Sequence, residues 1–564
     1  MVSLAQGETL MTQDPAGASR RALLAAGAAA AVASGLPGLA RAIARAPSVA
    51  GHRPELVPTP VTLAGWLRKL HDFGPIRATG TPQCRAFEEF LAAEFVKLGC
   101  TIERDRYRLS SWECALATDC AVTVKEDGGR TRTLEVVSYY PFCGTTRGKG
   151  PVSGRVLHAG TGQAAALAAL ERVDAATLKD AIVVIDMPIG TAGTDRIRLY
   201  PDGKFGSHDP LAHVGAPSAS GAGGAGLMKA LEGRCRGFVL CYTDVSNEAA
   251  RHNWLPFSEP HGKVPALWVG ASDSPYLKSV SGKATLTMRC DAHVTPDARA
   301  DTIVATLKGQ TDEVVMLTTQ TDGPNECNEN GGLGVLAVAT YLSKLPLSQR
   351  RRTYVFSLPT GHYAFGAVAD PVTGTGRRGG TFGVIEKRPE LMKRVVAQVA
   401  MEQMGAMDWA DIDGKYVPTG QPAPEYWLPT NAAPATRPTS VATSPNSAPT
   451  ALGTEAMAAA VRRMFAVANF DENPAWSRSG VVQSGFAPGE GGALRSRGIP
   501  GIGLMGAPSY FFRADPKGVL EKLSPDVMHT QVSIFTKLMT LMDRLPPAKL
   551  RGEQPLTDED LFGS

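Results

Sequence analysis

The pattern of apolar and polar positions predicts an α/β domain built from the first and last parts of the chain. There, short apolar runs suited to buried strands alternate with amphipathic segments suited to helices. This order indicates a three-layer fold, a sheet of mostly parallel strands with helices on both faces. The predicted strands are 101–109, 302–307, 314–318, 352–357, 395–401 and 501–505, and the predicted helices are 61–73, 82–98, 334–345, 380–393, 454–467 and 525–545.

Residues 113–291 show a different pattern, in which short β-rich runs dominate. Helical pieces are predicted only at 164–170 and 225–231, and a Gly/Ser/Ala-rich loop at 190–224 interrupts the segment. We expect an inserted domain with its own small core, either a β-sandwich or an open barrel with helices. Its predicted strands are 121–124, 133–139, 154–158, 181–185, 237–242 and 264–269.

Three segments lack such periodicity. Residues 47–60 form a Pro-rich linker, and residues 416–450 are rich in Pro, Thr and Ala, with Tyr426 and Trp427 near their start. That composition disfavours packed structure, so this insertion is expected to be solvated or to act as a lid. The tail at 546–564 is polar and is expected to be flexible.

The N-terminus resembles an export signal. Arg20 and Arg21 precede an uncharged Ala-rich segment, and small-x-small cleavage candidates follow at 40–42 and 44–46. We interpret residues 1–46 as a twin-arginine signal peptide, with the twin-arginine translocase as a partner and a periplasmic or extracellular destination. The alternative is an ordinary buried helix. No other stretch approaches the ~20 apolar residues of a membrane helix, so no integral segment is expected after signal removal.

Composition restricts the possible partners and the redox chemistry. The 564 residues are 43% hydrophobic and 20% charged, as in a globular protein, and the net charge of +4 is too small to favour nucleic acid. Export would allow disulfides among the nine cysteines, and two pairs are close enough in sequence to bond, Cys114 with Cys120 and Cys235 with Cys241. For most cysteines the alternative is a small buried hydrophobe.

Polar residues follow three of the predicted strands. Gln320, Asp322 and Glu329 come after strand 314–318, His362 and Tyr363 follow strand 352–357, and Glu402 follows strand 395–401. Ligands of α/β proteins bind beyond the carboxyl ends of their strands. These residues therefore form the candidate site.

The whole layout resembles the secreted zinc aminopeptidase and glutamate carboxypeptidase family with an inserted protease-associated domain. The resemblance rests on the loop Arg77-Ala78-Thr79-Gly80, the Gly-Ile-Pro-Gly-Ile run at 498–502 and the strand pattern at 264–269. It implies a zinc-peptidase-like domain over 61–112 and 292–545 and a protease-associated-like domain over 113–291. It also implies amide hydrolysis by two zinc ions with a separate general base.

The resemblance assigns roles to individual positions. Gln320, Tyr363 and Phe511 stand where the family has metal ligands, whereas Glu329 takes the bridging position and Glu402 another ligand position. His362 stands at the general base, and Glu490 represents an auxiliary acidic loop. Only Glu329 and Glu402 keep metal donors, a set that suits Ca²⁺ or Mg²⁺ better than zinc.

Three functions follow as alternatives. In a rebuilt hydrolase site, His362, Glu329, Glu402 and Tyr363 would be catalytic, and the substrate, a peptide or small amide, would be bound by the four residues Gln320, Asp322, Glu490 and Phe511. Alternatively, the chain is a non-catalytic pseudopeptidase that binds a partner. The third alternative is an active metallo-aminopeptidase with an atypical metal site.

Overall fold

The structure of the chain is a computed structural model. It describes residues 49–188, 198–199, 223–257, 259–364, 380–423, 425–430, 455–469, 479–483, 490–495 and 497–563. The predicted signal peptide and most of the loop at 190–224 lie outside these residues. Residues from Val49 onward form one compact unit.

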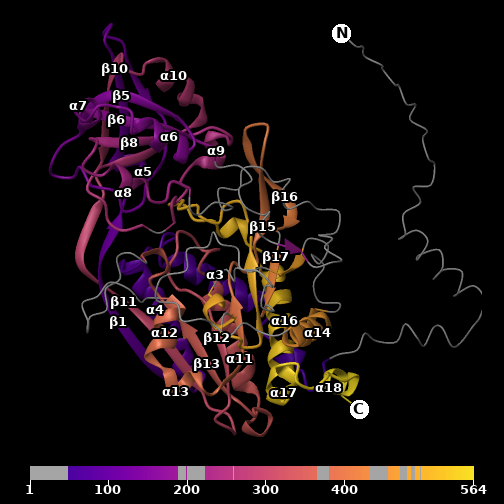
Figure 1. Ribbon diagram of the computed structural model, residues 1–564. Helices are drawn as coiled ribbons and strands as arrows, with labels where there is room; N and C mark the ends of the chain where they lie inside the picture. Colours follow the sequence, from indigo (N-terminus) through magenta and orange to yellow (C-terminus); the bar gives the residue numbers. More distant parts are fainter. Residues whose placement is uncertain are drawn as a thin grey trace, which may run out of the picture. The chain divides into compact units, whose positions relative to one another are not determined.

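A nine-stranded sheet organises the parts of the chain predicted to be α/β (Figure 1). Its four central strands are parallel, but β1 and β11 are antiparallel, as are β19 and β17. The sheet is therefore mixed rather than mostly parallel, because the chain leaves along β1 and returns along β11. In sheet order the strands are β1 (Thr101–Glu113), β11 (His293–Leu307), β13 (Thr353–Leu358), β12 (Val314–Thr318), β14 (Val395–Met401), β19 (Gly501–Gly506), β17 (Glu425–Pro429), β18 (Ser479–Gln483) and β7 (Arg198–Leu199).

Helices cover both faces of this sheet, as the sequence predicts. Along β12, Val315 and Leu317 join the core that contains the long helices, whereas Val314 and Met316 join a second core with α12 and α15. The long helices are α3 (Pro60–Asp72), α4 (Pro82–Lys97), α11 (Gly331–Lys344), α14 (Glu455–Asn469) and α16 (Pro525–Arg544), and the other face carries α12 (Gly380–Lys387), α13 (Pro389–Met392) and α15 (Gly492–Arg495).

Local sequence explains where several helices begin. Thr59, Thr81 and Ser524 cap α3, α4 and α16 through their side-chain oxygens, and a proline follows each cap. The helix predicted to begin at residue 334 begins three residues earlier, at Gly331. A Cβ on Gly331 would lie 2.0 Å from the Met401 carbonyl oxygen, so glycine permits close packing on β14.

Apart from β7, the strands that the structure describes in the segment 113–291 form one eight-stranded sheet rather than the two sheets of a β-sandwich. The two edge strands, β3 and β4, are separated by only Glu135, so the two edges of the sheet meet at this point of the chain. In sheet order the strands are β3 (Thr131–Leu134), β2 (Cys120–Glu126), β10 (Ala284–Cys290), β5 (Val152–Thr161), β6 (Ala181–Met187), β8 (Gly237–Tyr242), β9 (Ala266–Val269) and β4 (Val136–Tyr139), and the helices are α5 (Leu116–Asp119), α6 (Gln163–Leu170), α7 (Ala175–Lys179), α8 (Leu227–Leu231), α9 (Asn247–Ala250) and α10 (Ser274–Ser279).

Two segments expected to be unpacked are folded where the structure describes them. β16 (Lys415–Pro422) pairs with β15 (Met407–Ile412), and β17 joins the main sheet, with Trp427 fully buried against Phe465 and Phe535. Residues 431–450 lie outside the described residues. The tail forms α17 (Pro547–Leu550) and α18 (Asp558–Phe562), whose leucines are buried. In both segments, apolar residues at suitable positions are buried although the segment as a whole is polar or rich in proline.

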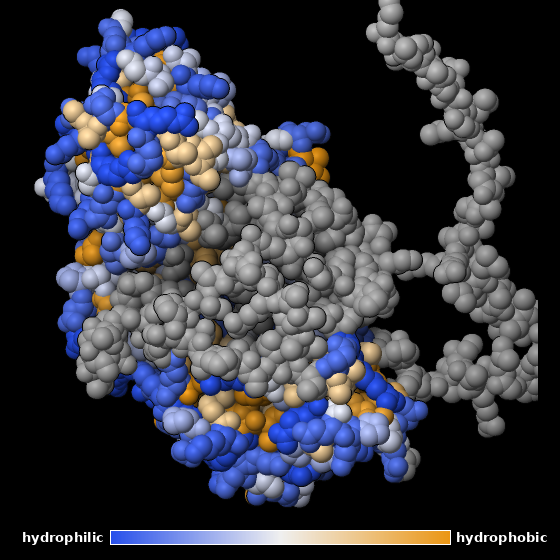
Figure 2. All heavy atoms as spheres, viewed as in Figure 1, coloured by the Kyte–Doolittle hydropathy of each residue, from blue (hydrophilic) through white to orange (hydrophobic). Residues whose placement is uncertain are grey.

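The described surface offers few large hydrophobic side chains. Figure 2 shows hydrophilic residues over much of one face, with hydrophobic residues between them. The exposed large hydrophobic residues are scattered single positions: Val61, Val96, Leu347, Phe382 and Ile412. Within the part of the chain that the structure describes, none of the helices combines the length and the apolar character needed to cross a membrane.

Candidate functional site

The carboxyl ends of β12, β13 and β14 meet at one edge of the sheet and carry the predicted site residues. Parallel pairing of β12 with both neighbours fixes this arrangement. Most of these side chains are buried, whereas Phe511 is half-buried and His362 keeps 19% of its side chain exposed. The buried members are Gln320, Asp322, Glu329, Tyr363, Glu402 and Glu490.

Asp322 anchors the turn that follows β13. Its carboxylate accepts hydrogen bonds from the backbone N–H of Tyr363 at 2.9 Å and of His362 at 3.2 Å, and from the Thr79 hydroxyl at 2.5 Å. Burial raises the pKa of Asp322 above its ordinary value. The carboxylate therefore positions His362 and Tyr363.

Glu329, at the position that the resemblance gives to the bridging ligand, forms an ion pair with Arg77. Both side chains are completely buried. Arg77 also donates to the carbonyls of Leu70, at 3.2 Å, and Gly74. Burial lowers the pKa of Arg77 to about 10, so the guanidinium stays charged at neutral pH. A buried cation thus already balances the Glu329 carboxylate.

His362 is connected to Glu402 through Glu490. Its Nδ1 lies 2.8 Å from the Glu490 carboxylate, and the Glu490 backbone N–H donates to Glu402 at 2.5 Å. Burial by itself lowers the pKa of His362, but Glu490, Asp322 and Glu402 outweigh burial and raise it. These carboxylates therefore favour the imidazolium form.

Glu402 has a second cationic neighbour in Arg495, whose side chain is also buried. Burial lowers the pKa of Arg495 to about 10, and burial together with Glu490 raises the pKa of Glu402. The charge network of this site therefore combines carboxylates with organic cations. Its members are Asp322, Glu329, Glu402, Glu490, Arg77, Arg495 and His362.

Neutral hydrogen bonds hold the remaining predicted residues. The Gln320 side-chain amide donates to the Asn328 side chain at 2.7 Å. Asn325 donates to the backbone carbonyls of Tyr510, Phe511 and Arg513, which fixes the loop that carries Phe511. Gln320 therefore uses its donor on a neighbouring side chain, and Phe511 offers only a ring.

Aromatic side chains from the segments that follow α9, β13 and β19 line the site. Phe257 lies 5.5 Å from the His362 ring, 5.9 Å from Tyr363 and 5.8 Å from Phe512, and Phe511 packs edge-on against Phe512. The backbone N–H of Trp254 donates to the Phe512 carbonyl at 2.7 Å. This aromatic rim consists of Trp254, Phe257, Tyr363, Phe511 and Phe512.

Several of these residues were missed by sequence reasoning. Arg77 and Thr79 stand in a loop noted only as a family marker, and Arg495 and Phe257 carried no local signal. Tyr426 and Trp427, in the segment expected to be solvated or to act as a lid, belong to the core strand β17 instead. Long-range pairing, which local patterns do not encode, assembled the charge network and the rim.

The residues at this edge do not fit a two-zinc centre. Among residues that the structure describes, the one group of three or more ligand side chains with donor atoms within 4.8 Å of one another is Cys114, Cys120 and Cys290, where the chain passes between the two sheets. At the candidate site, Glu329 is paired with Arg77, and Phe511 has no donor atom. Zinc requires convergent nitrogen, sulfur or carboxylate donors, which the described residues at this edge do not present.

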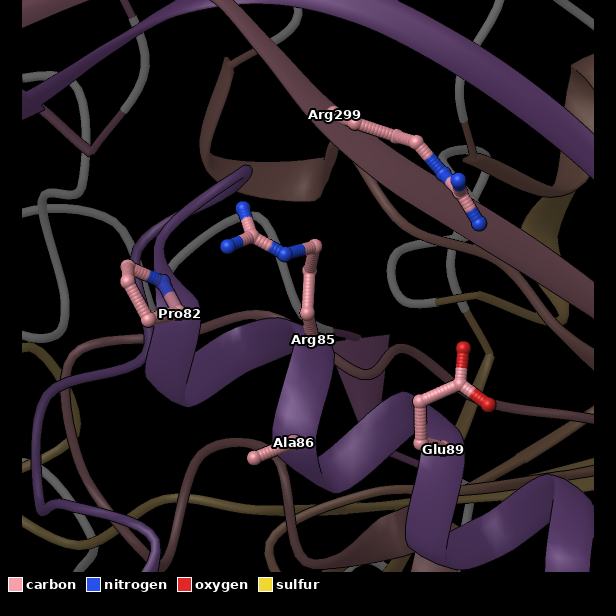
Figure 3. Close-up of a pocket in the computed structure, with 5 residues that line it drawn as sticks. All are labelled: Pro82, Arg85, Ala86, Glu89 and Arg299. Atoms are coloured by element: carbon pink, nitrogen blue, oxygen red, sulfur yellow. The ribbon is translucent and has the colours of Figure 1, made fainter.

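A surface pocket of about 470 Å³ lies away from this site. It is lined by Pro82, Arg85, Ala86 and Glu89 of α4 and by Arg299 of β11 (Figure 3). Arg85 donates to the Gly80 carbonyl, and Glu89 pairs with Arg104, so the charged side chains there have partners. None of the predicted site residues lines this pocket.

Comparison with solved structures shows what fold this is. A peptidase M28 precursor from Shewanella amazonensis SB2B superposes with a TM-score of 0.54 at 15% identity, covering 85% of this chain and 92% of that chain. A zinc aminopeptidase from Bacillus subtilis gives 0.52 at 12% identity, with 86% and 95% covered. An aminopeptidase from Aneurinibacillus sp. strain AM-1 gives 0.51 at 13%, with 86% and 94% covered.

At the level of sequence alone, neither a family model nor a curated protein matches the chain. Identities of 12–15% establish shared architecture and leave the chemistry to the site itself. The chain therefore has a mixed α/β fold of the M28 peptidase type.

Proposed function

We propose that this chain is a peptidase-fold binding protein that does not perform two-metal amide hydrolysis. The proposal is carried by the buried ion pair between Arg77 and Glu329. A carboxylate that bridges two metal ions must face two cations, whereas here a guanidinium already occupies its immediate surroundings. The chain's own cations thus take over the charge balance that metal ions would supply.

The remaining features suit a ligand of peptide-like chemistry. His362 is partly exposed and has two aromatic neighbours, Phe257 and Tyr363, within 6 Å. An imidazolium donates hydrogen bonds to carbonyl or carboxylate oxygens, and half-buried rings such as Phe257 and Phe511 pack against apolar side chains. Peptides, which the aminopeptidases of this fold act on, combine both groups.

Two measurements on the full-length chain test this proposal. Aminoacyl p-nitroanilides with added zinc, manganese or cobalt should give no release that a chelator abolishes. A panel of short peptides, scored by thermal shift, should contain stabilising ligands whose effect weakens in His362→Gln. A control variant, His293→Gln, changes an exposed histidine at the start of β11 and should bind like the parent. Chelator-sensitive hydrolysis would contradict the proposal.

A second candidate is metal-independent acid–base chemistry at His362. It is favoured by the 2.8 Å contact between His362 and Glu490, because an oriented imidazole can donate or accept a proton at a bound amide or ester. Hydrolysis that persists in chelator and disappears in His362→Ala would establish it. If the same rate survives in His362→Ala, this site does not catalyse that reaction.

We further propose export of the chain by the twin-arginine route, on the basis of Arg20, Arg21 and the Ala-rich segment that follows them. The double substitution Arg20→Lys/Arg21→Lys should retain the full-length precursor inside the cell. Unchanged export of that variant would rule out recognition by this translocase.

A further inference from the structure

Four cysteines gather where the chain passes between its two sheets. Cys114 directly follows β1, Cys120 begins β2, and Cys290 ends β10 just before β11. Cys143, which follows β4, lies in the loop that packs against Cys290. β1 and β11, which run side by side in Figure 1, are the strands that enter and leave this region. We call these four residues the thiol cluster.

The sulfur atoms of Cys114, Cys120 and Cys290 lie close together, and that of Cys143 joins them through Cys290. Sγ of Cys114 lies 3.5 Å from Sγ of Cys120, and Sγ of Cys143 lies 3.6 Å from Sγ of Cys290. Cys114, Cys120 and Cys290 also have their sulfurs within 4.8 Å of one another. Four sulfurs placed about 2.3 Å from a tetrahedral zinc ion are separated by about 3.8 Å. The separations of 3.5 Å and 3.6 Å within the two pairs are close to this value.

We propose that the thiol cluster is a structural zinc site in which Cys114, Cys120, Cys143 and Cys290 are the ligands. A closed site with thiolate ligands is the arrangement that proteins use for structural zinc. The ion would join the two passages of the chain at the junction of the sheets. This inference does not depend on the function proposed above.

The position of Cys290 favours a metal over disulfides. Its sulfur lies 3.6 Å from that of Cys143 and within 4.8 Å of those of Cys114 and Cys120. A disulfide would join Cys290 to one partner only, whereas a metal ion can bind the sulfur atoms of Cys290 and its neighbours together. A shared metal ion explains why Cys290 lies beside the three other thiols.

Hydrogen bonds hold the ligand backbones in place without using the sulfur atoms. The Cys290 backbone N–H donates to the Thr146 hydroxyl at 2.9 Å, and the Thr146 N–H donates back to the Cys290 carbonyl at 2.8 Å. Trp112 donates through its indole N–H to the Cys143 carbonyl at 3.1 Å. Such supporting contacts orient ligands before a metal binds.

The other cysteines of this region provide a matched control. Cys235 is a buried free thiol outside the cluster, and its sulfur donates to the Leu231 carbonyl at 3.6 Å. Cys235→Ser should therefore leave the zinc content unchanged. The double variant Glu329→Gln/Glu402→Gln separates this site from the candidate functional site and should also retain the zinc.

The test begins with the full-length chain, purified under reducing conditions. Elemental analysis should find one zinc per chain, and titration with a mercurial should release it as four thiols are modified. Replacing zinc with Co²⁺ should produce the near-ultraviolet thiolate-to-cobalt charge-transfer band and intense visible bands of a tetrahedral thiolate site. Cys290→Ser and Cys114→Ser should each lower the zinc content to a small fraction of one per chain.

Two results would overturn the proposal. One is zinc-free protein in which peptide mapping without reduction finds Cys114–Cys120 and Cys143–Cys290 disulfides. The other is a zinc content that Cys290→Ser does not change. If that variant fails to fold, the mercurial and cobalt experiments on the unaltered chain decide. Zinc release without thiol modification would contradict the proposal, as would a cobalt spectrum that lacks the charge-transfer band.

Discussion

The ion pair between Arg77 and Glu329 gives the most direct test of how this site is balanced. Both side chains are completely buried, so neither charge can be hydrated when its partner is removed. Deleting one partner of a buried ion pair typically costs about 3–5 kcal/mol. Arg77→Met also removes the donors to the Leu70 and Gly74 carbonyls, and each unsatisfied carbonyl adds about 1–3 kcal/mol. We expect this variant to lose about 5 kcal/mol or more.

The double variant Arg77→Met/Glu329→Leu isolates the charge contribution. Replacing both partners with apolar side chains removes the unpaired charge, although the two carbonyls stay without their donor. The double variant should therefore be more stable than Arg77→Met by about 3 kcal/mol. Arg108→Met is a control that breaks an exposed pair with Asp297, whose side chains are 65% and 67% exposed, and should cost under about 1 kcal/mol.

Hydrogen exchange read by mass spectrometry is the suitable assay, because a chain with two sheets need not unfold in one step. Peptides that contain β12 and the start of α11 report on the sheet that carries Glu329. If the effects of Arg77→Met and Glu329→Leu, each measured alone, add up to the effect of the double variant, the reasoning is refuted. A second result would also refute the reasoning: adding chelator to the unaltered chain lowers the protection of β12 from hydrogen exchange but leaves β10 protected. Glu329 would then hold a metal ion.

Three further predictions concern other parts of the main sheet. Glu88 is buried and its pKa is raised to about 8, so its ionisation should destabilise the fold as pH rises from about 4.5 to about 8. In thermal unfolding at a series of pH values, Glu88→Gln should lack this pH dependence and be more stable than the parent at pH 8.5 by up to about 5 kcal/mol. Equal pH slopes for the two proteins would contradict the prediction. Because its pKa is raised in the folded chain, protonated His362 should stabilise the fold fully below pH ~6.5, and this stabilisation should be lost as pH rises through the folded pKa. The stability difference between the parent and His362→Gln should therefore shrink over that range. A difference that grows would show that the pKa of His362 is lowered rather than raised. Gly331→Ala should destabilise the fold by about 1–3 kcal/mol in urea unfolding, because its Cβ would overlap the Met401 carbonyl. The control Gly65→Ala, at a helix position with open space around it, should be neutral or stabilising. Unchanged stability of Gly331→Ala would show that α11 can shift.

Much of the secondary structure follows from the sequence alone. Strands at 314–318, 395–401 and 237–242 were predicted with the same bounds that the structure shows, because each is a short apolar run bounded by polar or turn residues. The same periodicity placed Gln320, His362 and Glu402 just beyond strand ends. Once parallel pairing is assumed, a polar site at one sheet edge follows.

The predictions that rested on the composition of a segment, rather than on the spacing of its apolar residues, were wrong. The Pro-rich stretch around Trp427 and the polar tail were expected to be unpacked, yet Trp427, Leu550 and Leu561 are buried. A few apolar side chains at suitable positions outweigh the average polarity of a segment, because burying each contributes about 1.5–3 kcal/mol.

Only the tertiary structure decided what the site residues contact. The sequence offered Glu329 as a metal donor, but the fold places the Arg77 guanidinium against it. It offered Cys114 and Cys120 as neighbours, but the fold brings them together with Cys143 and Cys290, two residues 147 positions apart. Local periodicity determines which face of an element is buried, whereas charge partners and clustered thiols depend on how distant elements pack, which no local pattern records.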